Sequence, residues 1–151
     1  MINSIINTVT PLTSNNSSVS FTTDSIRTRS STCCGWLNHD EGSANYDILE
    51  GEYYEIDVNI TASSATAGVI AFQLYKNGEP IPGTLMAETL AAADDYANLG
   101  VEAKIRVCCR GDANISLRAI PAVPTPTDPI TPIDTQVPII VNANLSIARL
   151  A

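Results

Sequence analysis

Apolar and polar residues alternate one by one in several short runs of this chain, which is the pattern of a β-strand with one buried face. The clearest run is residues 53–60, and similar runs cover residues 101–107, 115–119 and 141–147. Residues 68–75 are largely apolar on both faces, which is typical of a more deeply covered strand. Short alternating strands joined by turns rather than by crossover helices predict an all-β protein built as an antiparallel sandwich.

Two segments between these runs define the connections. Asn77-Gly78 lies between two strand-like segments and predicts a two-residue hairpin turn, because both residues tolerate positive φ. In residues 85–99 some apolar side chains recur at helical spacing. Their position between a hairpin and a clear strand favours a strand over residues 85–90, followed by a loop at Asp94-Asp95.

The chain of 151 residues is long enough for one domain and shows no internal repeat. Residues 1–18 contain a run of serine and asparagine and are interpreted as an arm and linker, which leaves residues 19–151 as the compact domain. Residues 121–138 carry six of the nine prolines. Because proline donates no ladder hydrogen bond, this segment is predicted to be an extended surface loop, partly polyproline II, before the last strand.

Charge and hydropathy exclude two classes of partner. The formal net charge is -8 and the basic residues are scattered singly, which argues against binding to nucleic acid. The amino terminus lacks the basic region and apolar core of a secretory signal, so synthesis in a cytoplasm is expected. No apolar run approaches the roughly 20 residues of a membrane-spanning helix, so no membrane association is expected.

Residues able to perform catalysis are scarce. The single histidine, His39, precedes Asp40 and Glu41, and these three residues could hold a metal ion, but a polar surface turn ending at Gly42 is the favoured interpretation. Neither a Gly-x-Ser-x-Gly elbow nor a phosphate-binding glycine loop is present. The carboxylates of Asp94 and Asp95 fit a solvated loop better than a calcium site. We therefore predict no catalytic residues, no cofactor and no metal.

The cysteines form two vicinal pairs, Cys33-Cys34 and Cys108-Cys109. Zinc ligands are usually spaced two to four residues apart, so neither pair predicts a metal site. Their redox state is left open. Arg110-Gly111-Asp112 matches a tripeptide that binds animal cell-surface receptors, but a strand-to-strand turn is the favoured explanation of Gly-Asp.

Three aromatic residues are candidates for contacts with a ligand or another subunit: Trp36, Tyr75 and Tyr96. Trp36 is the only tryptophan and could stack on a sugar, but packing in the core or between subunits is the favoured role for a lone indole. Tyrosines near strands likewise contribute first to packing.

The order of motifs resembles the TNF-like and C1q-like jelly roll. The resemblance covers residues 51–151 and rests on three motifs: Gly51-Glu52-Tyr53 entering a strand, Asn77-Gly78 followed by Ile81 and Gly83-Thr84, and Gly111-Asp112 before a late strand. More narrowly, the chain is similar to small virion proteins of bacteriophages of gut bacteria, of the head-fibre or capsid-decoration type. That resemblance implies a jelly-roll trimer displayed on the capsid exterior.

The resulting hypothesis is a non-enzymatic structural virion protein that forms a homotrimer and attaches to the major capsid protein through the amino-terminal arm or the proline-rich loop. The two apolar faces of residues 69–75 are expected to be covered by neighbouring subunits. One alternative is a carbohydrate- or cell-adhesion module at a fibre tip, which would bind a host surface glycan through Trp36 and the loop tyrosines. Another is a bacterial spore or surface jelly-roll protein.

Overall fold

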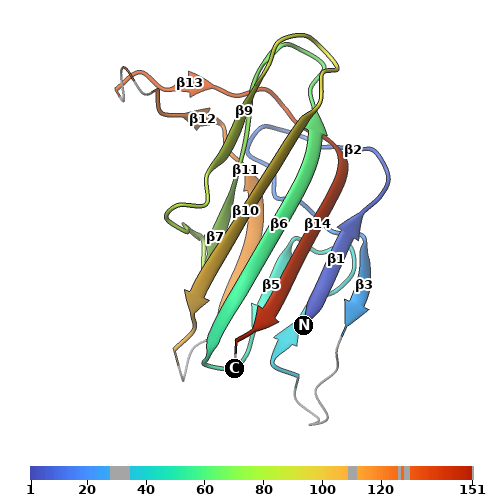
Figure 1. Cartoon of the computed structure of the whole chain (residues 1–151), viewed down its shortest axis with the longest axis vertical. Coiled ribbons are helices and arrows are strands. Elements are labelled where there is room, and N and C mark those ends of the chain that lie inside the picture. The colour runs from blue at the N-terminus through green and yellow to red at the C-terminus, as the bar shows by residue number, and fades with distance from the viewer. Residues whose placement is uncertain (28–34, 109–111, 126, 128–129, 151) are drawn as a thin grey trace.

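Two antiparallel β-sheets pack face to face in the computed structural model, which describes residues 1–27, 35–108, 112–125, 127 and 130–150 (Figure 1). The order of sheet A is β10 (Ala97–Arg106), β6 (Tyr53–Ser63), β14 (Ile139–Arg149), β1 (Ile2–Ile6) and β3 (Thr23–Arg27), with β2 (Thr10–Pro11) also paired with β14. The order of sheet B is β4 (Leu37–Asn38), β5 (Asn45–Ile48), β11 (Ala113–Ala119), β7 (Gly68–Lys76) and β8 (Glu79–Pro80), with β9 (Met86–Leu90) also paired with β7. The predicted antiparallel sandwich is therefore confirmed.

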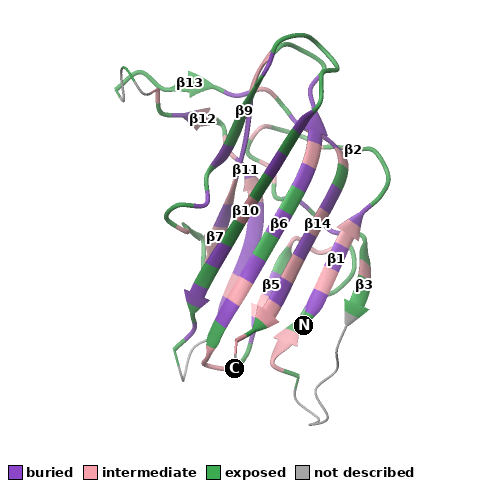
Figure 2. Cartoon of the chain, in the orientation of Figure 1, coloured by how far each residue is buried: buried purple, intermediate pink, exposed green. Residues whose placement is uncertain are grey.

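The core fills the space between the two sheets, and the alternation in the sequence determines which side chains enter it. In β6, Tyr54, Ile56 and Val58 are fully buried, while Asp57 and Asn59 on the opposite side of the strand are exposed (Figure 2). In β14 a register shift between Ile140 and Asn142 changes the phase of the alternation. None of the described residues forms a helix long and apolar enough to cross a membrane.

Both predictions for the connections hold. Asn77 and Gly78 have φ values of 53° and 82° in the hairpin that joins β7 to β8. Residues 86–90 form strand β9, paired with β7, and a loop with Asp94 at φ 63° follows it. The helical spacing in this segment is overridden by its position beside an established strand.

The amino-terminal residues correct the expectation of an arm that precedes the domain. β1 lies between β14 and β3 inside sheet A, and Ile2 and Ile6 are buried. The apolar–polar alternation of this strand is broken at its centre, which hides it from a pattern search. Ser4 faces the core with 0% exposure, while Ile5 lies on the opposite side of the strand.

The proline-rich segment leaves the sandwich as a two-stranded projection formed by β12 (Ala122–Val123) and β13 (Ile133–Asp134) (Figure 1). Its base is fixed to β7, where the amide of Gln136 donates to the carbonyl of Val69 at 2.7 Å. Gly68, which begins β7, has φ 142°, and a Cβ there would lie 2.8 Å from Cγ of Gln136. This position therefore requires glycine.

The outward side of β7 is not fully open within one chain. Ala71 points away from the core yet is only 1% exposed. At this end of β7 the amide of Ile120 donates to the carbonyl of Ala71 at 2.9 Å, and Thr135 pairs with Val69. Residues 120 and 135–136 therefore pair with the edge of β7 beyond the end of β11.

Candidate functional site

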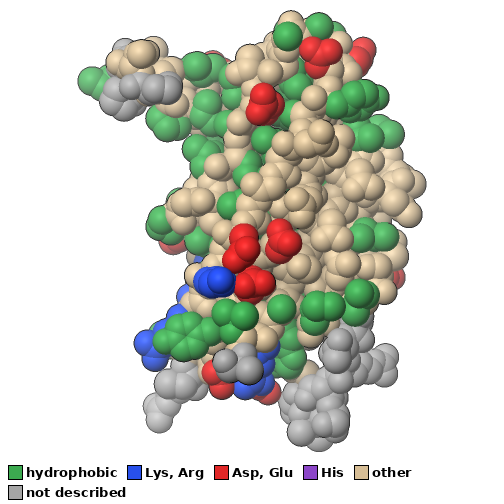
Figure 3. Space-filling model, in the orientation of Figure 1, with side chains coloured by type: hydrophobic (Ala, Val, Ile, Leu, Met, Phe, Trp, Pro, Cys, Tyr) green, Lys and Arg blue, Asp and Glu red, His purple; other side chains and the backbone are tan. Residues whose placement is uncertain are grey.

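The outer face of sheet A is flat and polar, and we call it the sheet A face. Its outward side chains are Asn98, Gly100, Glu102 and Lys104 of β10, Glu55, Asp57, Asn59 and Thr61 of β6, Asn142, Asn144, Ser146 and Ala148 of β14, and Asn3 and Ile5 of β1. Figure 3 shows that most of this face is neutral, with acidic and basic side chains gathered in its lower half. Within the part of the chain that the structure describes, no segment crosses it (Figure 1).

Small amide and hydroxyl side chains in the centre of this face bond to one another across the strands. The hydroxyl of Thr61 donates to Oδ1 of Asn98 at 2.8 Å, and Nδ2 of Asn144 donates to Oδ1 of Asn3 at 2.7 Å. Asn59 pairs with Gly100 on one side, where a Cβ would lie 2.9 Å from Oδ1 of Asn59. Glycine therefore gives this amide room to lie across the neighbouring strand.

Charged residues form one row of the face. Lys104 Nζ lies 3.3 Å from Oε1 of Glu102 and 3.6 Å from Oε2 of Glu55, and hydrogen bonding to Glu102 raises the pKa of the lysine. Asp57 pairs with Glu102 in the adjacent register. This row carries three acids and one base, and exposed pairs of this kind add little stability.

A flat face of short side chains offers a broad contact surface rather than a pocket for a small molecule. Its groups are already hydrogen bonded within one sheet, so the side chains lose little freedom when another surface packs against them. The chemistry that it supports is packing and hydrogen bonding to another protein surface.

A second polar cluster lies inside the sandwich and corrects the expectation that His39 belongs to a surface turn. The His39 side chain is fully buried, and its Nδ1 lies 2.9 Å from Oδ1 of Asp24. The hydroxyl of Ser4 donates to the same carboxylate oxygen at 2.5 Å, and Nε2 of His39 lies 3.2 Å from the carbonyl of Ser43. The turn that follows His39 and ends at Gly42, where φ is 86°, is exposed as predicted.

This cluster connects the two sheets. Ser4 and Asp24 belong to sheet A, whereas His39 follows β4 of sheet B. The hydroxyl of Ser4 donates to the aspartate, whereas in a Ser-His-Asp nucleophile relay the serine bonds to the histidine. The ring of His39 stacks on Tyr46 with centroids 4.0 Å apart, and burial raises the pKa of Tyr46.

The three aromatic candidates lie apart. Trp36 is half buried and stacks on Tyr54, with ring centroids 5.2 Å apart, at the start of β6. Tyr75 is on the outer side of sheet B, with the guanidinium of Arg118 4.6 Å from the centre of its ring. Tyr96 is 68% exposed in the loop just before β10. The start of β10 pairs with the carboxyl end of β6, so Tyr96 lies far from Trp36 at the start of β6. The three do not form one site.

The remaining sequence candidates have simple environments. Cys33, Cys34, Cys109, Arg110 and Gly111 lie outside the described residues, and Cys108 is exposed. Asp95 accepts a hydrogen bond from the amide of Ala92 within the loop before β10. Among the described residues, no group of three His, Cys, Asp or Glu side chains could hold a metal ion.

Sequence reasoning missed the residues of the sheet A face. The outward positions of 57–61 and 142–146 are mostly short amides and hydroxyls, where a solvated strand more often carries long charged side chains. That composition is the signal that could have identified the face.

The comparison with solved structures specifies which kind of antiparallel sandwich this chain forms. The globular domain of zebrafish complement 1qA protein aligns with 99% of this chain and 96% of its own length, with a TM-score of 0.62 and 9% identity. Rabbit GITRL covers 76% of this chain and 77% of its own, with 18% identity and a TM-score of 0.42. No family model and no curated protein sequence matches. The chain therefore has the C1q-like jelly-roll fold that the sequence predicted.

Proposed function

We propose that this protein is a non-enzymatic structural protein of a bacteriophage virion, a capsid decoration or head-fibre subunit that forms a homotrimer through the sheet A face. The open, flat sheet A face is the observation that carries the proposal. It spans the strands of one sheet and is formed by short, mutually bonded side chains.

The distribution of chemistry on this face suits three-fold symmetry. A cyclic trimer joins two different patches of each subunit, whereas a two-fold dimer joins one patch to itself. The half formed by β10 and β6 carries the charged row, and the other half carries Ile5 together with Ile26, which is 43% exposed. Each subunit can therefore place one half against the unlike half of the next.

The net charge of -8 supports a place outside the capsid, because dense nucleic acid would repel an acidic protein. The resemblance of the sequence to phage decoration proteins supports the same location. A structural role also agrees with the buried cluster of Ser4, Asp24 and His39, in which the polar groups bond to one another inside the sandwich.

Two measurements test the proposal. Light scattering coupled to size-exclusion chromatography should give three times the subunit mass of 16.0 kDa at micromolar concentration. A stable monomer would contradict the trimer.

Proteomics of gradient-purified particles should find the protein, and antibodies should label intact particles. Absence from the particles, or epitopes that are reachable only in broken capsids, would contradict the exterior location.

A further inference from the structure

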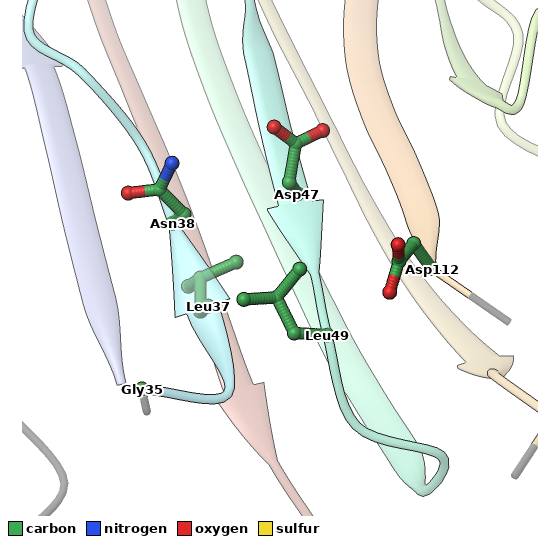
Figure 4. A pocket seen from close by; sticks show the side chains of 6 residues that line it. All are labelled: Gly35, Leu37, Asn38, Asp47, Leu49 and Asp112. Carbon is green, nitrogen blue, oxygen red and sulfur yellow. The ribbon is translucent and has the colours of Figure 1, made fainter. Parts of the chain in front are cut away.

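A hollow of about 450 Å³ opens on the outer side of sheet B, away from the sheet A face. It is lined by Gly35, Leu37, Asn38, Asp47, Leu49 and Asp112. Figure 4 shows Leu37 and Leu49 extending toward each other in its middle, with Asp47 and Asp112 beside them. The hollow thus has an apolar centre and an acidic rim.

The apolar centre is open to solvent. Leu49 is 47% exposed. Leu37 is half buried and packs partly against the core. A ligand with an apolar portion would remove this surface from water.

The acidic rim has unused acceptor capacity. Oδ1 of Asp47 accepts a hydrogen bond from Nδ2 of Asn114 at 2.7 Å, which leaves its other oxygen available. Asp112 is exposed. Within the described part of the chain, the lysine and arginine ion pairs involve other carboxylates, and no basic side chain lines the hollow.

We propose that this hollow is a docking site for an arginine side chain on a segment of a partner protein. The methylene chain of an arginine would lie on Leu37 and Leu49, while its guanidinium would donate hydrogen bonds to Asp47 and Asp112. Arginine fits better than lysine because its planar group carries five donors and can reach two carboxylates at once. The net charge of -8 would also attract a basic segment over a distance.

A methyl NMR titration of the full chain tests the proposal. The probe is the acetylated and amidated peptide Ala-Leu-Arg-Leu-Ala, and its matched control replaces arginine with citrulline, which has nearly the same shape but no charge. We expect the arginine peptide to shift the methyl resonances of Leu37 and Leu49. The citrulline peptide should bind about tenfold more weakly, since it loses charge-assisted hydrogen bonds. Equal binding of both peptides would overturn the proposal.

Matched variants separate local recognition from the charge of the whole protein. Asp47→Asn and Asp112→Asn should each weaken binding of the arginine peptide about threefold to tenfold. Asp134→Asn makes the same change in charge on exposed β13, beyond the opposite end of β7, and should leave binding unchanged. An equal loss in all three variants would show attraction by net charge and would overturn the site.

Calcium chloride provides the remaining control. Displacement of the peptide by calcium, where sodium chloride at equal ionic strength leaves it bound, would support contact with the two carboxylates. These titrations report only on the hollow. Their failure would leave the virion role and the trimer untouched, and failure of those would leave the hollow untouched.

Discussion

The outer face of sheet A carries short amide and hydroxyl side chains beside one charged row, whereas the outward side of β7 in sheet B is largely apolar and residues 120 and 135–136 pair with the edge of that strand. The sequence pattern alone favours β7 as the surface that another subunit covers, because both of its faces are apolar. The proposed interface is the sheet A face instead. Under this proposal, short side chains on an open sheet indicate an interface better than hydrophobicity does.

The largest effect, on trimer formation, is expected when an arginine is placed on the outer face of sheet A and, as a control, on the outer face of sheet B. Asn59→Arg puts a guanidinium in the middle of the sheet A face, and burying three such charges in a trimer would cost several kcal/mol per ion. Asn45→Arg makes the same change on the outer side of sheet B. Light scattering should show monomers for the first variant and trimers for the second. If both variants stay trimeric, the sheet A face is not the interface.

A large effect on stability is also expected in the buried cluster of Ser4, Asp24 and His39, which joins the two sheets. Asp24→Ala removes the partner of buried His39 and of Ser4, and should lower the free energy of unfolding by about 3–5 kcal/mol in urea denaturation. The control Asp40→Ala removes an exposed carboxylate beside the same histidine and should change it by less than about 0.5 kcal/mol. Similar losses in the two variants would contradict the role of the cluster.

The pairing of Gln136 with β7 is tested by Gly68→Ala. A Cβ at this position adds backbone strain and a collision with Gln136, which should cost about 1–3 kcal/mol. Hydrogen exchange of the Gln136 amide should become faster, because that amide bonds to Val69. Gly42→Ala is the matched control, since φ is 86° there but nothing lies within 4 Å of the added carbon. A loss no greater than in this control would argue against close packing of Gln136 on β7.

The smallest effect concerns alkaline pH. Burial raises the pKa of Tyr46 above its ordinary value of 10.0, so the folded protein keeps the proton that the unfolded chain releases. The stability from this difference is present below pH 10 and decreases as pH rises above it, by about 1.4 kcal/mol at pH 11. Tyr46→Phe should therefore show a shallower loss of stability between pH 9 and pH 11. Parallel curves would contradict the shift.

The strands and the hairpin could be predicted from the sequence because their signals are local. The alternation in residues 53–60 and the tolerance of Asn77-Gly78 for positive φ depend only on neighbours in the chain. The fold followed from their order.

The parts that escaped prediction depend on contacts between distant residues. Ser4 can face the core because Asp24, twenty residues later, accepts a hydrogen bond from its hydroxyl. His39 stands among polar neighbours in the sequence, so nothing local indicates that an aspartate and a tyrosine ring will enclose it. The openness of the sheet A face likewise could not be read locally, because it depends on the path of every loop.

The position of β14 has a consequence for how the molecule is made. This last strand lies between β6 and β1, so the opening residues of the chain cannot acquire their neighbour until synthesis has reached residue 149. On the ribosome, β1 and β6 therefore keep unpaired edges until β14 has emerged, and pairing over so long a sequence separation makes folding slow. A chain truncated before residue 139 would lack the middle strand of sheet A. It would remain unfolded and be degraded rather than form a shortened but functional domain.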